Sequence, residues 1–372
     1  MATEVIKIVD PDNGSGTNYT SLSAWEAGEQ GDLTGARDEI AVAKCRCTGG
    51  TADSTNVTID GWTADATRYI RVTADTGHEA AAKWDSSKYR LEITNPSATL
   101  ITISVQNTRI EKLQVGIVNT STHFIHLILL GDAASNCRVV GCFVRKIGTG
   151  NYCTGGIVNP YNANYDMYVV NNICYSNATY SHVKNSGILI GGGTKFGNTI
   201  AYNNTVYGFA YGIMADAPPA VFKNNLCQNQ SIQSYVLGSY PASGDYNLSG
   251  DSYSTEGSND RTNKTVTFVD VSNYDFHLSS SDTEARGYGT NLYNDPVFPF
   301  QTDIDGDDRG GSGAQWDIGA DEYIDSYQLP VNRQYIRGAT ATWYEVVDVY
   351  VLKDGVFVPD KIIKILDSGS WI

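Results

Sequence analysis

Three aspartates at alternate positions, Asp303, Asp305 and Asp307, place carboxylates close to one another in the C-terminal third of this chain. Carboxylate oxygens are the ligands that hard divalent cations prefer, so the spacing predicts a Ca²⁺ site. The pattern is not that of an EF-hand loop, which needs later ligands and a terminal glutamate. An ion pair with Arg309, together with caps on backbone N–H groups, accounts for the same residues. Both interpretations stand at this point.

A second set of acidic residues could support acid–base chemistry. Between positions 133 and 244 the sequence holds only two, Asp166 and Asp216, which are 50 residues apart. If that interval spans about two coils of a repeat, the two carboxylates could face each other as in a glycosidase. A basic residue such as Lys184 or Lys223 beside one of them would complete a site for proton transfer. Turn capping by each aspartate is the alternative.

Other reactive residue types do not assemble into a recognisable site. The histidines are scattered, and His123 and His126 are predicted on opposite faces of one strand, which argues against a shared metal. The seven cysteines lack Cys-x-x-Cys spacing, which argues against a structural zinc site. The sequence has no nucleophile elbow, and the glycine run at 191–195 lacks the first part of a phosphate-binding loop. This scarcity of catalytic groups favours a scaffold over an enzyme.

A repeated phrase indicates the architecture that must position these residues. Paired asparagines occur at 171–172, 203–204 and 224–225, and each pair is followed by a short apolar strand. The intervals of 32 and 21 residues are too irregular for leucine-rich or ankyrin repeats but suit a β-solenoid whose loops vary in length. Asparagine tolerates the left-handed region, and its amide can bond along a stacked ladder. Each pair therefore predicts a corner between two strands.

Composition agrees with an all-β chain. Of 372 residues, 37 are glycine and 24 tyrosine, and only 18% are charged. A short helix at 21–30, with Ser23 and Glu26 as a capping box, is predicted to close the open end of the first coil.

The net charge of −15 disfavours phosphate polymers and anionic membranes, and no apolar run approaches 18 residues. We therefore expect no nucleic-acid partner and no membrane insertion.

From about residue 90 to 325, dense short strands and the recurring steps Gly156-Ile157, Gly187-Ile188 and Gly212-Ile213 resemble the right-handed parallel β-helix repeat proteins. That architecture serves lyases, hydrolases, adhesins and viral spikes, so the resemblance implies fold more than chemistry. The segment 268–323 resembles the closing segment in which such chains return along the body, although residues 281–285 depart from the usual pattern. We expect four regions: an N-terminal cap and first coils (1–90), the β-helix body (91–250), the last coils and return segment (251–328), and a C-terminal β-hairpin module (329–372).

The C-terminal module carries an internal echo, in which residues 351–358 align with residues 365–372 around glycine-containing turns. It is similar to the strand-turn-aromatic modules that end some bacteriophage tail and fibre proteins. Its aromatic residues exceed what so small a module can bury alone. We therefore predict that it docks against a partner chain through Trp343, Tyr344, Tyr350, Phe357 and Trp371.

These features predict a structural virion protein of a bacteriophage: a surface-exposed β-helix spike, fibre or decoration protein. Its C-terminal module would bind other virion proteins or copies of itself, with a trimer favoured, and its tyrosine-rich body could bind surface glycans. The N-terminus lacks the basic and apolar regions of a secretory signal, in keeping with a virion location. The alternatives are a polysaccharide lyase or glycosidase, of tailspike or secreted type, and an extracellular carbohydrate-binding adhesin without catalysis.

Overall fold

The computed structural model divides into two compact units, residues 1–323 and residues 324–372. In the first unit it describes residues 2–118, 125–131, 133–148, 154–159, 166–177, 185–190, 199–215, 220–238 and 243–324. In the second unit it describes the backbone of the strands 333–337, 343–353, 356–367 and 370–371. Each unit is described by itself.

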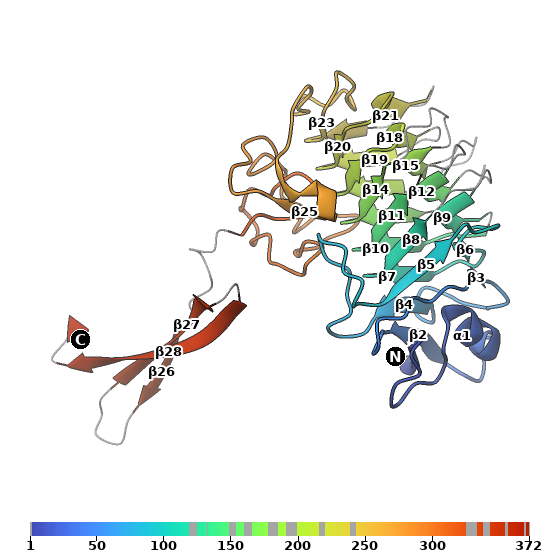
Figure 1. Ribbon diagram of the computed structural model, residues 1–372, viewed down its shortest axis with the longest axis horizontal. Helices are drawn as coiled ribbons and strands as arrows, with labels where there is room; N and C mark the ends of the chain where they lie inside the picture. The colour runs from blue at the N-terminus through green and yellow to red at the C-terminus, as the bar shows by residue number, and fades with distance from the viewer. Residues whose placement is uncertain are drawn as a thin grey trace. The chain divides into compact units, whose positions relative to one another are not determined.

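Three parallel sheets build the first unit, and Figure 1 shows their strands stacked coil upon coil with the helix α1 at the N-terminal end. The first sheet contains β1 (Thr3–Val9), β2 (Glu39–Cys45), β4 (Ile70–Ala74), β7 (Thr108–Glu111), β10 (Cys137–Val140), β13 (Met167–Val170), β16 (Thr199–Tyr202), β19 (Ala220–Lys223) and β22 (Ser243–Asp245). The second contains β5 (Arg90–Thr94), β8 (Gln114–Val118), β11 (Phe143–Ile147), β14 (Ile173–Ser176), β17 (Thr205–Tyr207), β20 (Leu226–Gln228) and β23 (Leu248–Ser249). The third contains β3 (Val57–Ile59), β6 (Ile101–Ile103), β9 (Ile125–Leu130), β12 (Thr154–Asn159), β15 (Ser186–Ile190), β18 (Tyr211–Ala215) and β21 (Gln233–Leu237).

Register places like residues above one another inside the coils. Val72 pairs with Ile110, Ile110 with Val139, and Val139 with Val169, and all four side chains are fully buried. Because strand side chains alternate, every second residue of a coil joins this core while its neighbours face outward. The predicted all-β fold, a right-handed parallel β-helix with a short N-terminal capping helix and a small C-terminal β module, is confirmed.

The second asparagine of each pair forms a buried ladder along the corner between the first and second sheets. Asn172 donates from both its backbone N and its Nδ2 to Oδ1 of Asn204, at 3.0 Å each. Asn204 bonds Asn225 in the same way, and Asn225 bonds Asn247. The carboxylate of Asp260 ends the ladder by accepting from the backbone N of Asn247. Every rung satisfies polar groups that would otherwise be buried without partners.

The first asparagine of each pair adopts the left-handed conformation, with φ of 54° at Asn171, 50° at Asn203 and 55° at Asn224. Their amides bond the return segment: Asn171 donates to the carbonyl of Thr302, and Asn224 donates to that of Thr290. The predicted corners therefore have two roles, because the inner asparagine joins coils and the outer one holds the returning chain.

The helix α1 (Leu22–Glu29) lies at the predicted place and buries Leu22 and Trp25, but its predicted capping box is wrong. The N-cap is Ser21, whose hydroxyl accepts from the backbone N of Ala24. The carboxylate of Glu26 instead accepts from Nε1 of Trp62 at 3.0 Å, where it is buried.

The chain after the last coil packs against two outer faces of the body. The strands β24 (Phe268–Asp270) and β25 (Asp275–Leu278), joined by a 3₁₀ turn (Val271–Asn273), cover the second sheet, where Phe276 packs edge-on against Phe143. Further along, Leu292 and Trp316 cover part of the first sheet. These contacts agree with a closing segment that returns along the body.

The second unit is an antiparallel sheet of β26 (Arg333–Arg337), β27 (Trp343–Lys353), β28 (Val356–Asp367) and β29 (Ser370–Trp371). Across the hairpin, Lys353 pairs with Val356, so the two longest strands flank residues 354–355. No helix among the described residues is long and apolar enough to cross a membrane.

Candidate functional site: a polar cleft at the last coils

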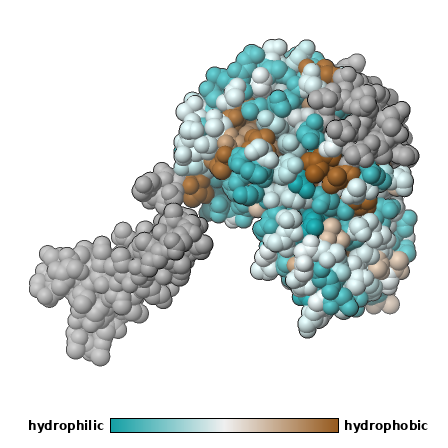
Figure 2. All heavy atoms as spheres, viewed as in Figure 1, coloured by the Kyte–Doolittle hydropathy of each residue, from teal (hydrophilic) through white to brown (hydrophobic). Residues whose placement is uncertain are grey.

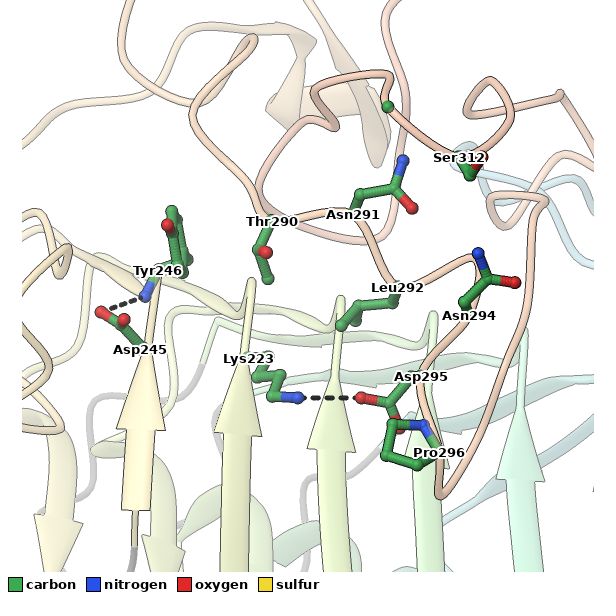
Figure 3. Close-up of a pocket in the computed structure, with 11 residues that line it drawn as sticks. Lys223, Asp245, Tyr246, Thr290, Asn291, Leu292, Asn294, Asp295, Pro296 and Ser312 are labelled. Carbon is green, nitrogen blue, oxygen red and sulfur yellow. Dashed lines mark hydrogen bonds and ion pairs between the residues drawn. The ribbon is translucent and has the colours of Figure 1, made fainter.

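A hollow of about 490 Å³ opens where the last coils meet the return segment (Figure 3). The ends of β19 and β22 form one side, and the loop after residue 289 forms the other. Most of the residues that line it are of polar type, although apolar atoms make up much of the wall: Lys223, Asp245, Tyr246, Thr290, Asn291, Leu292, Asn294, Asp295, Pro296, Ser312 and Gly313.

An ion pair closes one wall of this hollow. Nζ of Lys223 lies 2.8 Å from Oδ2 of Asp295, and Figure 3 shows the two side chains reaching toward each other. Oδ1 of Asp295 accepts the backbone N–H groups of Val297 and Phe298, each at 3.0 Å. Burial alone would raise the pKa of Asp295, but the bonds from Lys223 and these N–H groups outweigh it and lower that pKa. The carboxylate is therefore ionised and fully engaged, which leaves no free general base here.

Asp245 and Tyr246 lie beside Lys223 along the strand ends that form one side of the hollow. Oδ1 of Asp245 accepts the backbone N–H groups of Tyr246 and Asn259, and its Oδ2 accepts from the Asn259 amide. Tyr246 has φ of 59° and precedes Asn247, so it occupies the left-handed corner position that asparagine takes in the three preceding coils. The left-handed conformation costs a tyrosine on the order of 1 kcal/mol or more. Residues with such backbone strain cluster at functional sites.

A second hollow of about 420 Å³ shares Tyr246 and is lined by Asn259, Asp260, Arg261, Tyr288 and Gln315 as well. The Arg261 guanidinium lies 3.5 Å from the centre of the Tyr288 ring, and it pairs with Glu284 at 2.5 Å. Tyr288 as a whole residue is 42% exposed. Together the two hollows form a cleft around Tyr246 that offers amides, hydroxyls and an exposed ring, which suits a polyhydroxylated ligand.

Two of the three aspartates of the predicted Ca²⁺ site bond separate backbone groups. Oδ1 of Asp303 accepts the backbone N–H groups of Asp305 and Asp307, and its Oδ2 accepts that of Glu322. Asp305 instead accepts from the backbone N of Ala82 at 3.1 Å. Burial raises the pKa of Asp303 to about 6 despite the nearby positive charge. These bonds fit the capping interpretation.

Arg309 is paired as the alternative interpretation required, but with a different acid. Its guanidinium is buried and lies 2.9 Å from Oε2 of Glu322, and it also donates to the carbonyls of Gly319 and Ala320. It lies 3.3 Å from Oδ1 of Asn171 as well, which ties the return segment to the first predicted corner.

A histidine that the sequence left unassigned joins this region. Nδ1 of His277 lies 2.5 Å from Oδ1 of Asp275, and its Nε2 lies 3.5 Å from Oδ1 of Asp305. Burial alone would lower the pKa of His277, but the bond to Asp305 and the charges of Asp321 and Asp305 raise it to about 10. The donor atoms of His277, Asp305 and Asp321 lie within 4.8 Å of one another, a spacing that a metal could also use. A protonated imidazole donates from both nitrogens, so His277 can bond Asp275 and Asp305 at the same time.

Of the predicted acid–base residues, the structure describes Asp166 and Lys223. Asp166 is half-buried just before β13, where its carbonyl accepts the backbone N–H of Cys137. Lys223, one of its proposed basic partners, is paired with Asp295. Asp216 and Lys184 lie outside the described residues. The docking residues Trp343, Tyr344, Tyr350, Phe357 and Trp371 all fall in the strands of the second unit.

Comparisons with known proteins add a fold-level similarity. No family model matches the chain, and no curated protein matches it. Solved structures similar to it include a pectate lyase, at 13% identity and a TM-score of 0.36, over 87% of this chain and 97% of that one. They also include the deglycosylated pectin methylesterase of Aspergillus niger, at 12% identity and a TM-score of 0.38, over 73% of this chain and 95% of that one. At these values neither similarity bears on the activity of this chain.

Proposed function

We propose that this chain is a non-catalytic β-helix scaffold of the spike, fibre or decoration type found on bacteriophage virions. Residues 324–372 join it to neighbouring subunits, and the cleft around Tyr246 binds surface glycans. The observation that carries the proposal is the division of the chain into a β-helix unit and a separate antiparallel unit.

The composition of the second unit supports attachment. Consecutive apolar residues in β27, such as Val346 and Val347, belong to opposite faces of a strand, and they pair with Ile363 and Ile362 of β28. Both faces of this sheet therefore carry apolar positions, whereas a lone sheet facing water needs one polar face. In contrast, hydrophilic residues cover most of the visible face of the β-helix unit, with hydrophobic residues in small patches (Figure 2). The apolar unit is the better attachment element.

The state of the cleft carboxylates favours binding over catalysis. Asp295 is held by Lys223, and Asp245 is held by backbone and amide N–H groups. Asp260 accepts from the backbone N of Asn247 and from the backbone N and hydroxyl of Thr255. A glycosidase needs one carboxyl group free to give a proton and another free to attack or to activate water. All three groups already have structural partners, so we expect binding without product release.

A glycan array with the full-length protein tests whether the cleft around Tyr246 binds glycans. We expect binding to a defined set of glycans, its loss in Tyr246→Asn, and no new reducing ends or unsaturated products after incubation. Tyr253→Asn, at an exposed tyrosine outside both hollows, is the control and should bind like the wild type. Product release that is abolished by Asp295→Asn would instead support the lyase or glycosidase alternative.

A further inference from the structure

A row of three arginines stands on the outer face of the first sheet. Arg71 of β4 pairs in register with Arg109 of β7, and Arg109 pairs with Arg138 of β10. Neighbouring strands are about 4.8 Å apart, so these cationic side chains leave the backbone side by side. Like charges at directly paired positions destabilise a sheet. The repulsion within this row must therefore be offset by other interactions of the arginines.

Among the residues that the structure describes, only the first arginine of the row has an anionic partner. Arg71 lies 2.8 Å from Oε2 of Glu111 and 3.4 Å from Oε1 of Glu4. Arg109 lies over the ring of Tyr69, with 3.4 Å between the guanidinium carbon and the ring centre. Within the described part of the chain Arg109 has no ion pair, and Glu111, the carboxylate near it, is already bonded to Arg71.

Arg138 likewise has no ion pair with any described residue. Its guanidinium carbon lies 5.4 Å from the ring centres of both Tyr168 and Phe298. Its Nε is buried without a hydrogen-bond partner among the described residues. Burial raises the pKa of Tyr168, and the charge of the nearby Asp166 raises it further. The charge of Arg138 lowers the same pKa. Ion-paired arginines of this chain, such as Arg145 and Arg261, also have a buried Nε without a partner, so the missing ion pair is what distinguishes Arg138.

This arrangement is exceptional in so acidic a protein, whose net charge is −15. Of the eleven arginines at positions 2–324, eight form ion pairs. Arg286 does not, but it donates to the carbonyl of Ser280 and lies over a tyrosine ring. Arg109 and Arg138 are thus the two that lack both an anionic partner and a hydrogen-bond acceptor in the described part of the chain.

The part of the first sheet that the return segment covers ends next to Arg109 and Arg138. Phe298, from that segment, packs on Tyr168 with ring centres 5.6 Å apart. Both are partly buried and pack against the hydrophobic cluster on the outer side of the first sheet, toward its C-terminal coils. Arg138 stands at the border of this cover, and Arg109 stands one strand closer to the N-terminal end. Two guanidinium groups flanked by aromatic rings result.

We propose that Arg109 and Arg138 form a binding site for the oxyanion, a carboxylate or a sulfate, of an acidic saccharide. Guanidinium groups match such oxyanions with two parallel N–H donors, and two adjacent groups can hold one oxyanion between them. The rings of Tyr168 and Phe298 provide an apolar wall for the sugar. Nucleic acid is disfavoured because the field of the whole chain repels a dense polyanion. This site is separate from the cleft around Tyr246 and does not rest on the function proposed there.

Thermal unfolding of the full-length protein tests the proposal. The probes are sodium sulfate and sodium glucuronate, against glucose and sodium chloride at matched ionic strength. Near saturation, at about ten times the Kd, we expect the effective anion to raise Tm by roughly 2–4 °C. Arg109→Gln and Arg138→Gln should each abolish that rise, whereas Arg68→Gln, at an ion-paired arginine, should keep it. Using variants also removes the general stabilising effect of sulfate, which acts on any protein.

Two further results separate an anion site from simple packing. Without added anion, Arg109→Gln should unfold at the same or a higher temperature than wild type, because it relieves like-charge repulsion. Arg138→Lys keeps the positive charge but loses the two parallel N–H donors of the guanidinium group. Calorimetric titration should therefore show at least about tenfold weaker binding of the anion. A response to glucuronate alone or to sulfate alone identifies the group bound. If wild type and both glutamine variants respond equally to every anion, and Arg109→Gln lowers Tm, the arginines only pack and the proposal fails.

Discussion

Nδ2 of Asn204 donates to Oδ1 of Asn225 at 2.9 Å, and both amides are completely buried. The same amide nitrogen also donates to the carbonyl of Val169 at 2.8 Å. One side chain thus joins three successive coils, so the ladder acts as a tie along the length of the β-helix. Low exposure makes each of these bonds costly to lose.

Replacing Asn204 by alanine is expected to lower the free energy of unfolding by about 3 kcal/mol, because the backbone N–H and the Nδ2 of Asn172 lose their buried acceptor and the Val169 carbonyl loses a donor. Chemical denaturation measures this loss. Asn56→Ala, at an exposed asparagine, is the control and should change stability by less than about 0.5 kcal/mol. Equal effects of the two substitutions would show that the ladder is not a stabilising element.

His277 predicts a pH dependence. Its folded pKa of about 10 exceeds the ordinary value of 6.5, so its contribution is complete below pH 6.5 and is lost as the pH rises toward 10. The stability difference between wild type and His277→Gln should therefore shrink over that window, as followed by denaturant unfolding at several pH values. Comparing the two proteins removes the common effect of other titrating groups. A difference independent of pH would mean that His277 is neutral between Asp275 and Asp305.

The same region predicts the response to calcium. Because Asp303 caps three backbone N–H groups and Asp305 contacts His277, we expect Tm to change by less than about 1 °C between millimolar Ca²⁺ and a chelator. Differential scanning calorimetry of the full-length protein measures it. A rise of several degrees with Ca²⁺, lost in Asp307→Asn, would contradict this expectation and support the calcium site that the sequence predicts.

The pair of Lys223 and Asp295 predicts how firmly the return segment is held. Lys223→Met leaves a buried carboxylate without its cation and should destabilise the protein by about 2 kcal/mol, with Asp295→Asn somewhat milder. A double-mutant cycle should give a coupling energy of at least about 1 kcal/mol. Additive effects would show that the two side chains do not stabilise each other.

The repeat and the corners could be predicted because asparagine marks its own backbone conformation, as Asn171 and Asn203 do with positive φ. The corner at Tyr246 and Asn247 was missed because a tyrosine replaces the first asparagine. The cleft was also beyond prediction, since Lys223 and Asp295 are 72 residues apart and no local pattern links them. Partners of the return segment are set by how the chain folds back, which spacing along the sequence does not encode.

Attachment through residues 324–372 is tested most directly by the mass of the full-length protein in solution, measured by light scattering, beside that of a chain ending at Ile324. We expect the full-length protein to form an oligomer, with a mass near three times the 40.3 kDa of one chain favoured, and the shortened chain to be a monomer that keeps its glycan binding. If the full-length protein is a monomer, or if both chains form the same oligomer, the second unit does not join neighbouring copies and the proposed attachment is contradicted.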